Sequence, residues 1–145
     1  MKLENFDLSK PYGAIELRGL GHNWDLHNFA TFQGITFEPQ RNELILEWRV
    51  TAGNSNPWGS QNNLATGCRL RFRGLKSLVV TTRSAAYSLE ESQCLSEISK
   101  VIPGQREYPY KQIWSEGEQF HLRLGFQDER CFDIEAESAV LEALE

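Results

Sequence analysis

The stretch QFHLRLGFQDERCFDIEAE, residues 119–137, decides the fold class of this chain. Apolar and polar residues alternate from residue 120 to residue 127 and again from residue 131 to residue 137. A short polar turn, Asp128-Glu129-Arg130, separates the two runs. This pattern predicts two antiparallel strands that bury one face and expose the other to water. On the exposed face, the second strand would present three carboxylates: Asp133, Glu135 and Glu137.

Other segments repeat the alternation. It predicts a short strand within residues 14–20, a turn over residues 22–29, and a hairpin of residues 31–37 with residues 43–50. Gly34 shifts the alternation of the first hairpin strand by one residue, as a β-bulge does. Residues 68–73 form a further strand, which Gly74 interrupts before the chain continues as LKSLVVTT.

One helix is predicted, in the connection after residue 87. Ser88 and Glu91 form a capping box, Leu95, Ile98 and Ile102 follow at helical spacing, and a Pro-Gly pair ends the segment. The tail SAVLEALE has helical propensity but follows a strand directly, so helix and strand both remain open for it.

These elements predict a mostly β protein with a single domain over residues 1–145. The architecture is an antiparallel β-sandwich or a strongly curled sheet, with one helix in a connection. Five large apolar side chains are expected to share its core: Trp48, Phe72, Phe120, Phe126 and Phe132.

Composition narrows the setting of the protein. No apolar run approaches the roughly 20 residues that span a membrane, and the first residues carry no secretory signal. The three cysteines are widely spaced and odd in number, which fits reduced thiols better than a disulfide framework. We therefore expect a cytoplasmic protein without a membrane partner, and no motif implies a cofactor.

Charge is unevenly distributed along the chain, whose net charge is −5. Residues 48–89 contain six basic residues and no acid, whereas residues 116–145 contain nine acids and two arginines. Opposite charges on neighbouring strands can form cross-strand pairs, and this is the expected fate of the Arg69, Arg71 and Arg73 stripe. A nucleic-acid partner is not expected, because the pI is about 5.3 and Phe72 points away from the stripe.

Few residues suggest catalysis. His22, Asp25 and His27 form H-x-x-D-x-H, which offers three metal ligands at a spacing typical of no common metal site. The alternative is that these side chains cap turn backbone groups while Trp24 packs inward. Cys131 lies beside Asp133, and a neighbouring carboxylate raises the pKa of a thiol and makes it a poorer nucleophile. The sequence therefore predicts a protein that is not an enzyme.

Trp58 lies in the polar loop of residues 52–63. A tryptophan in such a loop either packs back on its own domain, contacts a protein partner, or stacks on a sugar with nearby amide side chains. The sequence leaves these three alternatives open.

Three segments carry a resemblance: LILEWRV (44–50), GCRLRFRGLKSL (67–78) and LRLGFQDERCFDIEAES (122–138). In their order they resemble small β-rich bacterial proteins that include immunity proteins of toxin systems. The resemblance spans roughly residues 30–140 and includes no catalytic signature. It implies a non-enzymatic protein that sequesters a partner.

The leading hypothesis is thus a cytoplasmic binding protein for a basic protein partner, such as a toxin. The contacts would come from Trp58, Asp133, Glu135 and Glu137. The alternative is a sugar- or metal-binding domain or hydrolase that uses His22, Asp25 and His27. Homo-oligomers are compatible with either hypothesis.

Overall fold

The computed structural model describes residues 1–51, 65–103 and 115–145. In this part of the chain, ten strands and one short 3-10 helix make up the regular structure. In chain order they are β1 (Lys2–Glu4), β2 (Phe6–Leu8), β3 (Glu16–Gly19), β4 (His22–Asp25), β5 (Ala30–Glu38), β6 (Glu43–Val50), β7 (Gly67–Val80), η1 (Glu91–Gln93), β8 (Leu95–Val101), β9 (His121–Phe126) and β10 (Cys131–Leu144).

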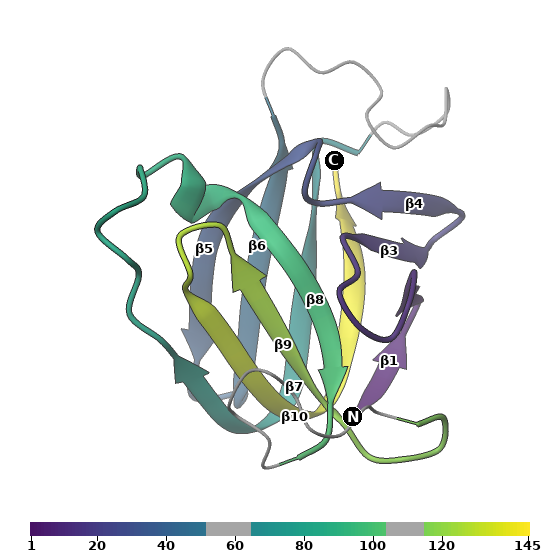
Figure 1. Ribbon diagram of the computed structural model, residues 1–145. Helices are drawn as coiled ribbons and strands as arrows, with labels where there is room; N and C mark the ends of the chain where they lie inside the picture. Colours follow the sequence, from purple (N-terminus) through teal and green to yellow (C-terminus); the bar gives the residue numbers. More distant parts are fainter. Residues whose placement is uncertain (52–64, 104–114) are drawn as a thin grey trace.

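Seven strands form one strongly curled sheet. Six of them follow the order β5-β6-β7-β10-β9-β8 with antiparallel neighbours, and β1 adds to β10 in parallel. Figure 1 shows this sheet bending round so that β8 and β9 lie in front of β5, β6 and β7, which gives a half-barrel. The prediction of a mostly β, antiparallel fold is confirmed in its curled-sheet form.

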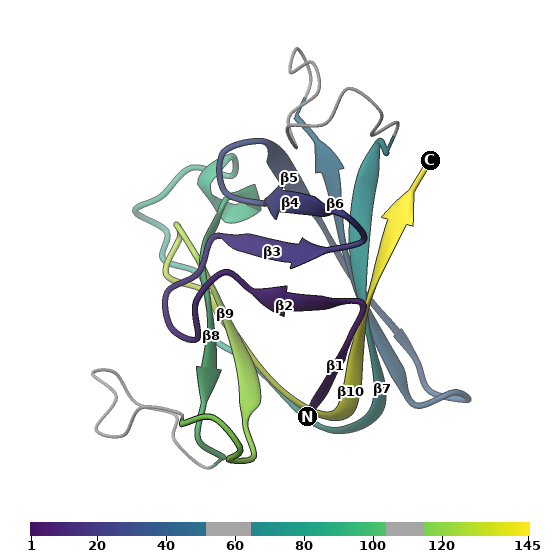
Figure 2. The same cartoon turned by 90° about the vertical axis from the view of Figure 1, so that its right-hand side faces the viewer.

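A second sheet of β2, β3 and β4 lies across the open side of the half-barrel (Figure 2). Its inward side chains Leu17 and Trp24, and Leu26 directly after β4, are fully buried in the same hydrophobic core as the curled sheet. Burial of large apolar side chains from both sheets supplies the main favourable free energy of such a fold. The sequence predicted a strand near β3, but it missed β1 and β2 and assigned β4 to a turn.

The hairpin that decided the fold class is β9–β10. Leu122, Leu124 and Ile134 are fully buried on the concave face, as the alternation predicts. Among the predicted core aromatics, Trp48, Phe72, Phe126 and Phe132 are buried, while Phe120 is partly buried against the core. The convex face departs from the prediction, because polar side chains of the hairpin are buried there too.

The β5–β6 hairpin and its bulge are confirmed. Phe32 pairs with Trp48 and Gly34 with Glu47, so the register shifts by one residue between them. Downstream, β7 runs unbroken through Gly74, whose φ of 60° lets the strand bend there. A Cβ at Gly74 would also lie 2.5 Å from Cδ of Glu137.

The arginine stripe forms the cross-strand pairs that the charge pattern predicts. Arg71 donates from Nη1 to Glu43 at 2.8 Å and from Nε to Glu142 at 2.9 Å. Arg69 lies 3.3 Å from Glu142 and Arg73 lies 3.7 Å from Glu43. The convex face of β6, β7 and the end of β10 is therefore largely self-compensated.

The predicted helix over residues 88–102 is wrong. The capping box forms, since Glu91 N–H donates to Ser88 Oγ and Ser88 N–H donates to Glu91 Oε1. It starts only the single turn η1, after which the chain becomes strand β8. A register shift between Leu95 and Glu97 places Leu95 and Ile98 on one face of the strand, so a bulge produces the spacing of a helix.

The tail that was left open between helix and strand belongs to β10, which pairs with β7 as far as Leu144. None of the helices in the described ranges is long and apolar enough to cross a membrane.

Candidate functional site

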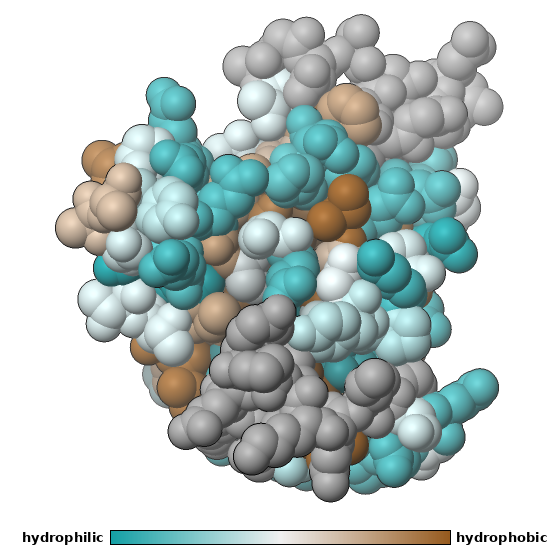
Figure 3. Space-filling view, in the orientation of Figure 1, coloured by the Kyte–Doolittle hydropathy of each residue, from teal (hydrophilic) through white to brown (hydrophobic). Residues whose placement is uncertain are grey.

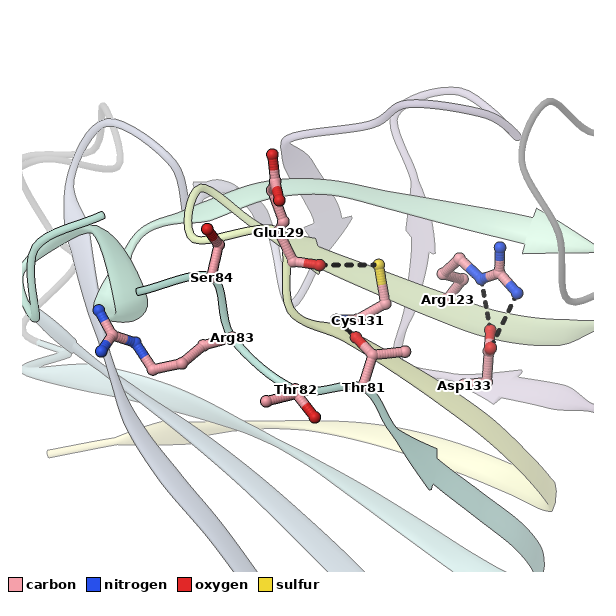
Figure 4. Close-up of a pocket in the computed structure, with 8 residues that line it drawn as sticks. All are labelled: Thr81, Thr82, Arg83, Ser84, Arg123, Glu129, Cys131 and Asp133. Carbon is pink, nitrogen blue, oxygen red and sulfur yellow. Dashed lines mark hydrogen bonds and ion pairs between the residues drawn. The ribbon is translucent and has the colours of Figure 1, made fainter. Parts of the chain in front are cut away.

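A shallow cavity lies where the end of β7 meets the β9–β10 turn, on the convex face of the sheet. Its volume is about 330 Å³. Figure 4 shows Cys131 and Thr81 near its middle, the Arg123–Asp133 pair at one end, and Arg83 pointing away at the other. Eight residues line it: Thr81, Thr82, Arg83, Ser84, Arg123, Glu129, Cys131 and Asp133.

Backbone pairing beyond the end of β7 builds the floor of this cavity. Thr81 N–H donates to the carbonyl of Cys131 at 3.0 Å, and Cys131 N–H donates to Thr81 Oγ1 at 2.7 Å. Ser84 N–H donates to the carbonyl of Asp128 at 2.8 Å. These bonds fix the hydroxyl-bearing segment against the start of β10.

Arg123 and Asp133 form a buried ion pair at the edge of the cavity. They are directly opposite each other on β9 and β10, and they are 5% and 6% exposed. Arg123 donates from Nε to Oδ1 and from Nη2 to Oδ2, the latter at 2.8 Å, so the pair is bidentate. Burial opposes ionisation of Asp133, but His121 and Arg123 outweigh it and lower the pKa of this carboxyl.

His121 joins this pair to a second carboxylate. The ring is 2% exposed, with Nε2 3.7 Å from Asp133 Oδ1 and Nδ1 4.0 Å from Glu135 Oε1. Both distances exceed hydrogen-bond length, and neither ring nitrogen has a hydrogen-bond partner in the described part of the chain. The His121 ring therefore lies buried between two carboxylates without a hydrogen bond to either.

Cys131 is the one thiol in the cavity lining. Burial raises its pKa most; Arg123 lowers it, but Asp133, Glu97 and Asp128 raise it further. This agrees with the expectation that the carboxylate beside Cys131 opposes thiolate formation. At neutral pH the site therefore presents a protonated thiol.

Carboxylates surround the buried pair. Glu97 of β8 faces Cys131 across Gly125, Glu129 is exposed on the turn, and Glu135 follows Asp133 on β10. Within the described ranges none of these three forms an ion pair with an arginine or lysine. In contrast, ion pairs with arginines neutralise three acids on the part of the convex face over β6, β7 and the end of β10: Glu43, Glu47 and Glu142.

The predicted partner-binding residues have different fates. The expectation that Asp133 faces water is wrong, because Asp133 is buried against Arg123 and His121. Glu135 is partly buried, with a side chain 31% exposed. Glu137 is exposed and lies at the bend beside Gly74. Trp58 lies outside the described residues.

The H-x-x-D-x-H side chains have separate surroundings, and Asp25 and Trp24 behave as the turn-capping alternative predicts, whereas the two histidines do not cap turn groups. Asp25 accepts the backbone N–H and the side-chain amide of Asn28, at 2.8 and 2.7 Å. His27 donates from Nδ1 to the carbonyl of Leu95 at 2.6 Å. The His22 ring packs edge-on against Trp24, which is fully buried. The described residues contain no group of three side chains placed to hold a metal ion.

Sequence reasoning missed Arg123, Glu97 and Thr81 as members of this site. A signal for Arg123 was present, because a short turn after Phe126 places residues 123 and 133 opposite each other with opposite charges. No comparable signal joins β8 to the hairpin, since its bulge hides the register of Glu97.

No protein-family model, curated protein or solved structure shows significant similarity to this chain.

Proposed function

We propose that this protein is a cytoplasmic, non-enzymatic binding protein for a basic protein partner. The partner surface is the convex face of β8, β9 and β10, with Glu97, Glu129 and Glu135 as its contacts. The observation that carries the proposal is a contrast in charge compensation between two regions of the convex face: one over β6, β7 and the end of β10, the other over β8, β9 and the start of β10. Arginines neutralise the carboxylates of the first region, whereas these three have no arginine or lysine partner in the described part of the chain.

An uncompensated acidic face favours association with a basic surface through long-range attraction. Such charges mainly raise the association rate and set partner choice, and salt screens them. The buried Arg123–Asp133 pair has a different role in this proposal, because its charges already satisfy each other. It fixes β9 against β10 and so positions the surrounding carboxylates.

The resemblance to immunity proteins supports one partner class within this proposal, a basic toxin. A toxin that acts on an anionic substrate needs a positively charged channel, and an acidic face fits that channel. Bound carboxylates would then exclude the substrate by occupying its site. Glu137 is a further proposed contact at the edge of the same region.

The experiment is an affinity capture from the native host's lysate at low and high salt, with bound proteins identified by mass spectrometry. The captured protein is then purified, and its binding is measured against the wild-type chain and against Glu97→Lys, Glu129→Lys and Glu135→Lys combined. The matched control reverses three acids that are not proposed contacts: Glu4 of β1, Glu16 of β3, and Glu145, which follows the far end of β10.

The proposal expects the site variant to lower the association rate constant at least about tenfold at low salt, with the control close to wild type. Circular dichroism checks that both variants remain folded. Binding that is unchanged in the site variant, or that is insensitive to salt, would contradict the acidic-face proposal.

A further inference from the structure

The two edges of the curled sheet differ in how they are covered. Residues before β3 cover the β8 edge: Ala14 and Ile98 exchange backbone hydrogen bonds of 2.9 and 2.7 Å, and Lys100 N–H donates to the carbonyl of Pro11 at 2.7 Å. At the opposite edge, β5 pairs with β6 and with no other strand in the described ranges. An uncovered edge presents backbone donors and acceptors that can accept another strand.

The second half of β5 is also unusually apolar for an exposed edge. Ala30 and Phe32, before the bulge, are 5% and 4% exposed, whereas Ile35 and Phe37 after it are 42% and 51% exposed. Ile35 pairs with Leu46 and Phe37 with Leu44, so both lie on the concave face beside fully buried residues. Figure 3 shows apolar surface at the lower left, the side where both β5 and β7 end in Figure 1.

We propose that residues 34–38 pair antiparallel with the same residues of a second copy of this chain. A two-fold axis through Thr36 sets the register. Thr36 then lies opposite Thr36 of the second copy, and Ile35 lies opposite Phe37 in both directions. Every pair keeps its side chains on one face of the joined sheet, and aromatic–β-branched and Thr–Thr pairs are favourable cross-strand neighbours.

Charge favours a second copy in this orientation. Glu38 is the single charged residue of β5, and a parallel arrangement would place it opposite its own copy. The antiparallel register instead places Glu38 opposite Gly34, which carries no side chain. Gly34 is paired with Glu47, whose carboxylate already binds Arg49 at 2.8 Å, so the acid nearest to the incoming Glu38 on the next strand is neutralised.

An open sheet edge can pair with further strands and lead to aggregation, so a feature of the structure must limit the pairing. The bulge at Gly34, with φ of 138°, breaks the regular strand and confines pairing to the five residues 34–38. A contact with two-fold symmetry uses the same surface of both copies, so it produces a closed dimer and no larger assembly. The dimer does not depend on the proposed function, because residues 34–38 include none of the carboxylates proposed as partner contacts.

The test is the molar mass of the full chain in solution, measured by sedimentation equilibrium over a wide concentration range. The wild-type chain is expected to approach twice the 16.6 kDa of one copy as concentration rises. Thr36→Lys opposes two lysines at the axis, and it should raise the dimer dissociation constant about fivefold. The matched control is Ser96→Lys, an exposed position on the covered edge strand β8, which should leave the constant unchanged.

A charge-swap pair separates the pairing from a loss of folding. Thr36→Lys and Thr36→Glu should each dimerise weakly alone and form mixed dimers when combined, because opposite charges then meet at the axis. A wild-type chain that stays monomeric at all concentrations overturns the proposal. So does a dimer that Thr36→Lys leaves intact, since its contacts must then lie on another surface.

Discussion

Replacing Asp133 with leucine should destabilise the protein far more than its place on a convex sheet face suggests. The substitution leaves the guanidinium of Arg123 buried at 5% exposure without its bidentate partner. Removal of one member of a buried pair costs about 3–5 kcal/mol, because the remaining charge is left uncompensated. For a domain whose total stability is about 5–15 kcal/mol, that is a large fraction of the free energy of unfolding.

The companion variants separate the charge effect from packing. Arg123→Met leaves Asp133 uncompensated and should cost a similar amount. The double variant removes both charges and should recover about 3 kcal/mol or more relative to either single variant, since apolar replacement of a buried pair is often neutral. Arg41→Leu is the control, because its pair with Glu38 is exposed and 3.9 Å long, and it should cost less than about 1 kcal/mol.

Urea unfolding measures all four variants, with fluorescence of the fully buried Trp24 and Trp48 as the signal. The two single changes and the double change form a double-mutant cycle, whose coupling energy should be several kcal/mol. If Asp133→Leu costs no more than Arg41→Leu, or if the two single costs simply add in the double variant, the reasoning about the buried pair is refuted.

Three further predictions concern pH, thiols and close packing. Although burial opposes it, the pKa of Asp133 is lowered from its usual 3.8. The ionised carboxylate therefore contributes to stability above about pH 4, and this contribution is lost as the pH falls through the lowered pKa. Urea unfolding measured against pH should show the loss in the wild-type chain and not in the Asp133→Leu chain. Burial raises the pKa of Cys131 and Cys68, so mass spectrometry should find slow alkylation of Cys131 and none of Cys68 until the chain unfolds; rapid labelling of native Cys68 would contradict the structure. Gly67→Ala places a methyl group against the carbonyl of Trp48 and should lower the free energy of unfolding by about 1–3 kcal/mol, and an unchanged thermal midpoint would show that the strands do not approach so closely.

Alternation of apolar and polar residues predicted the strands in which every second side chain packs into the core. The β9–β10 and β5–β6 hairpins follow from it, and the bulge at Gly34 was visible because glycine marks the shift. The bulge after Leu95 has no glycine, and Ser96 simply projects outward as an exposed side chain. Leu95 and Ile98 then share a face at a spacing of three, which a periodicity argument assigns to a helix.

The candidate site was harder to predict. Alternation in the sequence assigns residues to the two faces of a strand, but it does not show whether the polar face is also buried from water. Arg123, Asp133 and His121 occupy positions that an ordinary hairpin leaves in water, yet all three are buried. Their polarity predicted exposure to water, whereas Arg123 and Asp133 satisfy each other's charge across the hairpin and His121 lies beside Asp133.

The structure shows which carboxylates near this pair are neutralised internally, and composition alone does not. Nine acids in the last thirty residues looked like one acidic face. The structure divides them: Glu142 neutralises arginines of β7, Asp133 neutralises Arg123, and Glu97 of β8 joins Glu129 and Glu135 around the cavity instead. A binding role can rest only on the charges that remain after internal pairing, because a carboxylate already held by a buried arginine contributes little to attracting a partner.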